Sequence, residues 1–174
     1  MRCLRHLTPQ GGFSLAEMLV VVAILAIVAA IVIPNIGSAG DSQAISAASV
    51  LKSDIEVARS LALTTQQPHS VLFSPDRQSY KVVANYTGGD YATAVAIAHP
   101  VVAMKSFVVN LSALNGMSDV TVVSVSFDGA TYVTFNAQGD PSWAGSVTLR
   151  AGSTQMQIQV TALTGTVMVT RMAG

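Results

Sequence analysis

Apolar residues follow three different patterns along the chain, and each pattern predicts a different element. Residues 13–33 are apolar on every face apart from Ser14 and Glu17. Residues 38–67 carry apolar side chains at three- and four-residue spacing, which is typical of an amphipathic helix. After residue 68, short runs rich in Val, Ile, Thr and Phe are separated by Gly, Pro, Asp and Asn, which predicts strands joined by turns. The pattern therefore predicts a long helical region followed by a sheet.

The first apolar segment is long enough to cross a bilayer. Phe13 to Ile33 is 21 residues, and a helix of that length is about 32 Å long, close to the thickness of the hydrocarbon core. Arg2 and Arg5 precede the segment, and no acidic residue does. The positive-inside tendency then keeps the N-terminus in the cytoplasm and places the rest of the chain across the membrane.

Glu17 is the charged residue of this segment. A charge at the centre of a membrane helix costs roughly 2.5–3.5 kcal/mol, and somewhat less near an end. Two opposite charges are tolerable together in lipid and costly apart. The position of Glu17 therefore predicts a cationic partner, and the alternative is a plain single-pass anchor with a stray carboxylate.

Small residues lie before the apolar run, at Gly11 and Gly12. A secretory signal would instead carry its small-residue cleavage site on the far side of the run. Cleavage after Gly12 would leave the anchor attached and start the mature chain at Phe13, and glycine suits such a site because it lets an enzyme backbone approach closely. Pro34 removes a helix hydrogen bond, so we expect a kink or local melting between Pro34 and Gly40, with helix after it.

The N-terminal segment resembles the class III signal of type IV pilins and type II secretion pseudopilins, through Gly12-Phe13-Ser14-Leu15-Ala16-Glu17, the apolar run and Pro34. The resemblance implies cleavage after Gly12 by a prepilin peptidase, which also N-methylates Phe13. It implies that Glu17 pairs with the Phe13 ammonium of a neighbouring subunit in a filament. It also implies insertion in the inner membrane, contact with the assembly platform there, and a periplasmic C-terminal domain.

The second helical stretch, Ser38 to about Gln67, has a single apolar stripe, formed by Ile45, Ala48, Leu51, Ile55, Ala58 and Ala62. Asp41 or Ser42 could cap its N-terminus, and the residue before Pro68 is biased out of the helix. An apolar stripe needs a sheet to cover it. We therefore expect an α+β fold like that of pilins, with a long N-terminal helix, transmembrane in its first half, packed on a C-terminal antiparallel sheet domain.

The expected boundaries are a leader peptide at 1–12, a transmembrane helix and assembly segment at 13–36, and a soluble domain at 37–174 whose amphipathic helix spans about 41–67. Six or seven strands are expected, at 69–74, 79–86, 120–127, 131–136, 146–150, 155–162 and 166–171, with turns at Gly152 and Gly165. Asp128-Gly129 is a hairpin signal that would pair 120–127 with 131–136. Residues 91–118 have no clean period and receive no assignment. In 155–162, apolar residues alternate with Gln, which indicates one buried face.

Two further stretches resemble the GspH/FimT group of minor pseudopilins and minor pilins. They are Leu51 to Leu63 followed by Val71-Leu72-Phe73, and Val133 to Gly139 with a strand pair closed by Gly165 and Val167. The resemblance implies a subunit at the filament tip that helps to initiate assembly and contacts secretion substrates or, in FimT-like proteins, DNA. A minor subunit of a type II secretion pseudopilus or type IV pilus is the main hypothesis, and a FimT-like DNA receptor in natural transformation is the alternative.

Charge and cysteine content narrow these hypotheses. Without Arg2 and Arg5 of the leader, seven of the nine Lys and Arg residues remain against nine Asp and Glu, a net charge of −2. The basic residues are scattered, which does not favour nucleic-acid binding. The single cysteine, Cys3, lies in the leader, so the mature chain forms no disulfide and depends on core packing.

No pattern predicts an enzyme, a cofactor or a metal centre. His69 and His99 have no further ligands at metal-binding spacing and are interpreted as ordinary strand or loop residues. The alternation of Asn136, Gln138 and Asp140 has some likeness to a calcium loop, but true calcium loops are richer in carboxylate, so a plain hairpin loop is favoured. Trp143 is interpreted as a buried anchor of that loop, with an exposed contact residue as the alternative.

Overall fold

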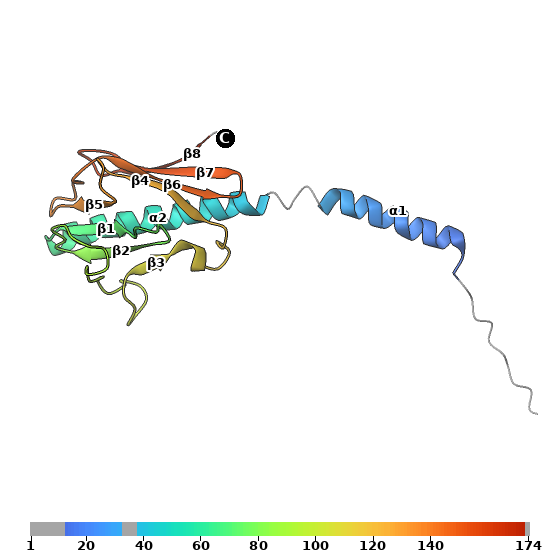
Figure 1. Ribbon diagram of the computed structural model, residues 1–174, viewed down its shortest axis with the longest axis horizontal. Helices are drawn as coiled ribbons and strands as arrows, with labels where there is room; N and C mark the ends of the chain where they lie inside the picture. The colour runs from blue at the N-terminus through green and yellow to red at the C-terminus, as the bar shows by residue number, and fades with distance from the viewer. Residues whose placement is uncertain (1–12, 33–37, 173–174) are drawn as a thin grey trace, which may run out of the picture. The chain divides into compact units, whose positions relative to one another are not determined.

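The computed structural model describes residues 13–32 and 38–172, and the chain divides into two units (Figure 1). The unit that ends at Gly37 contains helix α1 (Leu15–Val32). The unit that begins at Ser38 contains helix α2 (Ser38–Thr65) and the strands of two sheets. Among the described residues, no helix combines the length and the apolar character needed to cross a membrane.

The second unit is built on two four-stranded antiparallel sheets. The first has the order β3-β2-β1-β5, with β1 (His69–Phe73), β2 (Ser79–Ala84), β3 (Val108–Asn110) and β5 (Tyr132–Phe135). The second has the order β4-β6-β7-β8, with β4 (Thr121–Ser126), β6 (Gly145–Ala151), β7 (Thr154–Val160) and β8 (Val167–Met172). A short 3₁₀ helix, Leu111–Ala113, follows β3.

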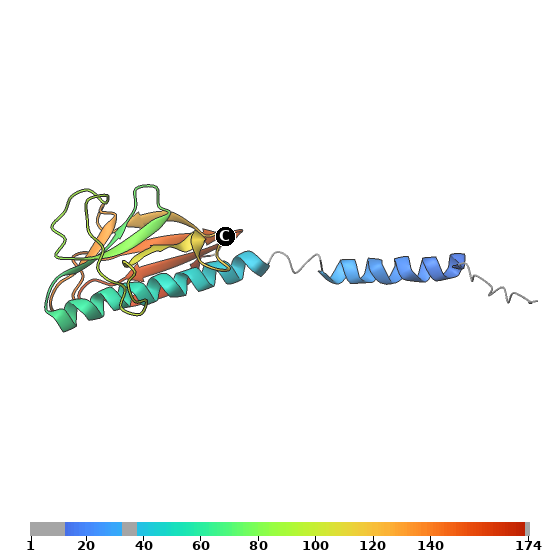
Figure 2. The ribbon, with the colours of Figure 1, turned by 90° about the horizontal axis from the view of Figure 1, so that it is seen from below.

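Helix α2 packs against strands of both sheets, and the core lies between the helix and these strands (Figure 2). Leu51 and Ile55 are completely buried, and burying each contributes roughly 1.5–3 kcal/mol. The rest of the buried stripe is alanine, which lets the helix approach the strands closely; its members are Ala44, Ala47, Ala48, Ala58 and Ala62. Ile45, expected in this stripe, is instead 49% exposed, and Ala44 takes the inward position.

The alternation in the C-terminal strands is confirmed. Met156, Ile158 and Val160 of β7 face the core, and the intervening glutamines do not. Gly152 and Gly165 stand in the turns on either side of β7 with φ of +58° and +60°, a region that favours glycine. The α+β fold class is confirmed as well, although the strands form two sheets where one was expected.

The predicted pairing of 120–127 with 131–136 is wrong. The tight turn at Asp128-Gly129 is present, and Phe127 and Ala130 exchange both backbone hydrogen bonds at 3.0 Å. Beyond the turn the chain changes sheets, because β4 pairs with β6 whereas β5 pairs with β1. Phe127 and Phe135 both enter the common core. A local turn signal does not specify which sheet the following strand joins.

The start of α2 also differs from the expectation. The helix begins at Ser38, so Asp41 lies inside its first turn and neither Asp41 nor Ser42 is the N-cap. Residues Ser38 to Gly40 are helical, which contradicts local melting as far as Gly40. Pro34 and the kink expected there lie outside the described residues.

Candidate assembly site

Helix α1 begins at the predicted processing junction. Ser14 precedes its first residue, and its Oγ accepts the backbone N–H of Glu17 at 3.2 Å. The carbonyl oxygen of Ser14 accepts the N–H groups of Glu17 and Met18. Ser14-Leu15-Ala16-Glu17 therefore has the Ser-x-x-Glu pattern of a capping box, and the Glu17 charge lies near the positive end of the helix dipole.

The surface of α1 is apolar and open on every side. Side chains 13–29 are all exposed, and the large ones range from 47% at Val21 to 83% at Leu15. In this surface, Glu17 is the single acidic residue. Within the described part of the chain, no hydrogen bond or ion pair engages its carboxylate. The α1 surface therefore offers a wide apolar face and one carboxylate that the described residues leave unpaired.

The described segments place the predicted site residues as follows. Phe13 is 76% exposed and stands directly before the cap. Phe13 and Glu17 therefore both lie at the N-terminal end of α1. Gly12 and Pro34, the predicted cleavage and kink residues, lie outside the described residues.

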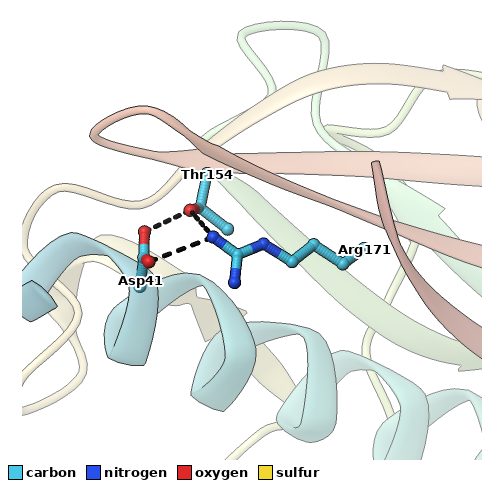
Figure 3. Close-up of polar contacts among 3 residues, drawn as sticks. All are labelled: Asp41, Thr154 and Arg171. Carbon is cyan, nitrogen blue, oxygen red and sulfur yellow. Dashed lines mark hydrogen bonds and ion pairs between the residues drawn. The ribbon is translucent and has the colours of Figure 1, made fainter. Parts of the chain in front are cut away.

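At the start of α2, three side chains from three elements meet in a contact that we call the junction cluster: Asp41, Thr154 and Arg171 (Figure 3). The Thr154 hydroxyl of β7 donates to Asp41 Oδ1. Arg171 Nη2 of β8 donates to Asp41 Oδ2 at 3.0 Å and lies 3.0 Å from Thr154 Oγ1. The hydrogen bond from Thr154 is the main cause that holds the pKa of Asp41 below its usual range; desolvation opposes it, and the charge and hydrogen bond of Arg171 lower the pKa further.

A second carboxylate, in the middle of α2, is tied to the first sheet. The Tyr80 hydroxyl of β2 donates to Asp54 Oδ2 at 2.5 Å, and Tyr80 is fully buried. Burial raises the pKa of Asp54, and the hydrogen bond from Tyr80 partly opposes this. Burial and the neighbouring Asp54 charge raise the pKa of Tyr80 well above its ordinary value.

The end of α2 meets two loops. Arg59 Nε donates to the Gly139 carbonyl at 2.9 Å. A Cβ on Gly165 would come within 2.9 Å of the same carbonyl, and one on Gly139 would come within 3.0 Å of the Leu63 side chain. These three segments therefore pack closely around Gly139.

Trp143, in the loop before β6, is 53% exposed, so its interpretation as a buried anchor is wrong. Leu163, in the turn after β7, is 87% exposed. Gly145 pairs with Val160, so both apolar side chains lie beyond the same end of the β6–β7 ladder. Both are exposed apolar side chains of the second unit.

The histidines and the loop before β6 have ordinary structural contacts. His69 is buried in β1 with its ring Nδ1 2.9 Å from the Gln67 carbonyl, and His99 Nδ1 accepts the N–H groups of Val101 and Val102. Asn136 Oδ1 accepts two backbone N–H groups of its own loop. In the described segments, no three His, Cys, Asp or Glu side chains are grouped as a metal site would need.

Models of known protein families match both the N-terminal segment and most of the second unit. Residues 7–33 match the prokaryotic N-terminal methylation motif. Residues 47–165, more than half of the chain, match the family described as type II transport protein GspH. The chain belongs to the GspH family. The family suggested by the sequence resemblance is therefore confirmed, and with it membership of the minor pseudopilins and minor pilins.

Two solved structures show the same fold. The minor pseudopilin EpsH from the type 2 secretion system of Vibrio cholerae has a TM-score of 0.54 at 8% identity, over 74% of this chain and 97% of that one. The type IV minor pilin FimU of Pseudomonas aeruginosa PAO1 has a TM-score of 0.54 at 15% identity, over 75% of this chain and 90% of that one. At these identities the likeness concerns the fold alone. No curated protein matches the chain.

The junction cluster was not found from the sequence. The sequence offers Asp41 as one of two possible helix caps, and it offers Arg171 only as one of several scattered basic residues. Asp41 is 113 residues from Thr154 and 130 from Arg171, so no local pattern connects them.

Proposed function

We propose that this chain is a minor pseudopilin or minor pilin subunit of a type II secretion pseudopilus or type IV pilus. It is incorporated through its N-terminal helix and acts in filament initiation and protein secretion. The observation that carries the proposal is Glu17, the acidic residue of a helix whose side chains are exposed throughout the described range 15–29. Family membership supports it.

In this proposal a prepilin peptidase cleaves after Gly12 and methylates the Phe13 amine. Processing places a new ammonium at the end of α1, one helical turn from Glu17. In the filament, the Phe13 ammonium of one subunit pairs with Glu17 of the next. Pairing opposite charges removes the penalty of leaving either one alone in apolar surroundings.

Before assembly, residues 13–33 anchor the subunit in the inner membrane, where the assembly platform engages it, and the second unit lies in the periplasm. The 21-residue apolar run and the two arginines of the leader support this topology. The β domain supplies contacts to partner proteins, and the exposed Trp143 and Leu163 are its apolar candidates for such contacts. We assign the chain no catalytic role.

The DNA-receptor alternative gains no support from the contacts of the basic residues. Of the seven that follow the leader, five bind acceptors within the chain: Lys52, Arg59, Arg77, Lys81 and Arg171. Salt-dependent retention of the protein on DNA would reverse this ranking.

The test replaces Gly12 with leucine and uses Gly11→Leu as the matched control, one residue further from the junction. The full chain is expressed with its secretion or pilus machinery. We expect Gly12→Leu to retain residues 1–12, by mass spectrometry, and to be missing from sheared filaments, whereas Gly11→Leu is processed and incorporated. Normal processing and incorporation of Gly12→Leu would contradict the proposal.

A further inference from the structure

The first turn of α2 is attached to the β domain by polar contacts. Among the side chains described from residue 40 onward, Ala44 is the first that is completely buried. Before it, Asp41 contacts Thr154 and Arg171, and the side chain of Gln43 accepts the backbone N–H of Asp119 at 3.1 Å. Residues 40–43 are therefore held from two sides by polar contacts.

The backbone of this turn also lies close to the β6–β7 hairpin. A Cβ on Gly40 would lie 3.2 Å from the carbonyl oxygen of Ala151 and 3.4 Å from the Cα of Gly152. Thr154 is the first residue of the second strand of that hairpin and donates a hydrogen bond to Asp41. Glycine at position 40 thus allows the close approach that brings Asp41 within reach of β7 and β8.

The cluster stands where the two units of the chain meet in sequence, because the second unit begins at Ser38. We infer that Asp41, Thr154 and Arg171 form a clamp that sets the residue at which the chain leaves the β domain. With the clamp closed, α2 is helical from Ser38. With the clamp open, the chain can separate from the domain as far as Ala44, where apolar burial begins.

The clamp therefore controls the length of the connection between α1 and the β domain. Six residues, 38 to 43, span about 9 Å as a helix and up to about 20 Å when extended. Opening would lengthen the connection between α1 and the β domain by about 11 Å. In a filament, this length decides how far a β domain can be displaced from its own anchor helix, and this last step rests on the proposed function.

Hydrogen exchange on the full chain in detergent micelles tests the clamp without requiring assembly. In an α-helix, the N–H groups of residues 42–46 bond to the carbonyl groups of residues 38–42, so they report on the first turn. Arg171→Gln removes the ion pair, and Thr154→Val removes the hydroxyl at nearly constant shape. Glu56→Gln is the matched control, because it breaks the exposed Lys52–Glu56 pair further along the same helix.

We expect exchange of the 42–46 amides to accelerate at least tenfold in Arg171→Gln and in Thr154→Val. Exchange of residues 51–59 and of β7 should stay at the wild-type rate, which shows that the domain remains folded. An unchanged rate at 42–46 in both variants, or an equal acceleration in Glu56→Gln, would overturn the inference. Failure of the subunit to assemble would leave this result unaffected, so it is distinguishable from failure of the proposed function.

Discussion

Helices α1 and α2 are both rich in apolar residues, but among the described residues only α2 has its apolar side chains packed. The inward side chains of α2 are completely buried against two sheets, whereas the described side chains of α1 are exposed on every face. Their charges differ in the same way, because Asp41, Asp54 and Arg59 of α2 bond to groups of the β domain. Within the described residues, the Glu17 carboxylate does not.

This difference separates what stabilises the domain from what remains for assembly. The α2 stripe contributes its burial energy to folding of the second unit. The described α1 surface has the composition of a buried helix without the burial, and in the proposed function its partners are neighbouring subunits. The predictions below test this division, beginning with the largest effect.

Truncating one leucine in each helix should change the stability of the domain only when the leucine belongs to α2. Leu51→Ala removes a fully buried side chain, and we expect a loss of about 2–5 kcal/mol in the free energy of unfolding. Leu25→Ala makes the same change in α1, where the side chain is 61% exposed, and should leave domain unfolding unchanged. Urea unfolding of the full chain in detergent, followed by circular dichroism, measures both. Equal losses would refute the division.

A new charge should impair membrane insertion when it is placed in α1 and have little effect when it is placed in α2. Leu25→Lys places a cation in the centre of the proposed anchor, at a cost of roughly 2.5–3.5 kcal/mol for insertion. Ile45→Lys places the same charge on an exposed apolar position of α2 and should have little effect. The carbonate-resistant membrane fraction measures insertion. An unchanged carbonate-resistant fraction for Leu25→Lys would show that residue 25 does not lie at the centre of a membrane anchor.

The Tyr80–Asp54 contact gives a smaller effect on folding. Tyr80→Phe removes the donor and leaves a half-buried carboxylate without it, so we expect a loss of roughly 1.5–3 kcal/mol. Tyr132→Phe, on β5 of the same sheet, serves as the control for loss of a hydroxyl. If both variants lose the same stability, the hydrogen bond to Asp54 is not what ties α2 to β2.

The two aspartates of α2 should respond to pH in opposite directions. Because Thr154 and Arg171 lower the Asp41 pKa, ionised Asp41 stabilises the fold above its ordinary pKa, and this contribution is lost as pH falls through the lowered value. Burial raises the Asp54 pKa, with Tyr80 and His99 opposing it, so its contribution is present below the ordinary pKa and lost as pH rises through the raised value.

The measurement is urea unfolding at pH 3 and pH 7. Relative to wild type, Asp41→Asn should lose less stability at pH 3 than at pH 7. The stability of Asp54→Asn relative to wild type should be higher at pH 7 than at pH 3. If the stability relative to wild type changed with pH in the same direction in both variants, the causes assigned to the two pKa shifts would be wrong.

The sequence was informative where the physical signal is local. The apolar spacing predicted α2 to within two residues at its C-terminal end, and the alternation at Met156, Ile158 and Val160 predicted the buried face of β7. Long-range pairing was inaccessible. The turn at Asp128-Gly129 was found, but the choice of sheet for the next strand depends on packing of residues far apart in the chain.

The candidate site shows the same limit. Glu17 stands out because a charge interrupts an apolar run, a contrast visible within one segment. Asp41 and Arg171 meet only after β8 has joined its sheet and α2 has packed against that sheet, and each by itself resembles an ordinary surface charge. Trp143 was misjudged because an aromatic residue carries no sign of which face of its loop will be covered.

The most direct test of the central claim is incorporation of Glu17→Gln into filaments, measured against wild type from the same cells. The change keeps the shape of the side chain and removes its charge, and Glu56→Gln is the control for loss of a carboxylate elsewhere. We predict that Glu17→Gln is processed at Gly12 and present in the membrane at wild-type level, with at least a tenfold lower content in filaments. Wild-type incorporation of Glu17→Gln would show that the carboxylate has no partner in the assembly.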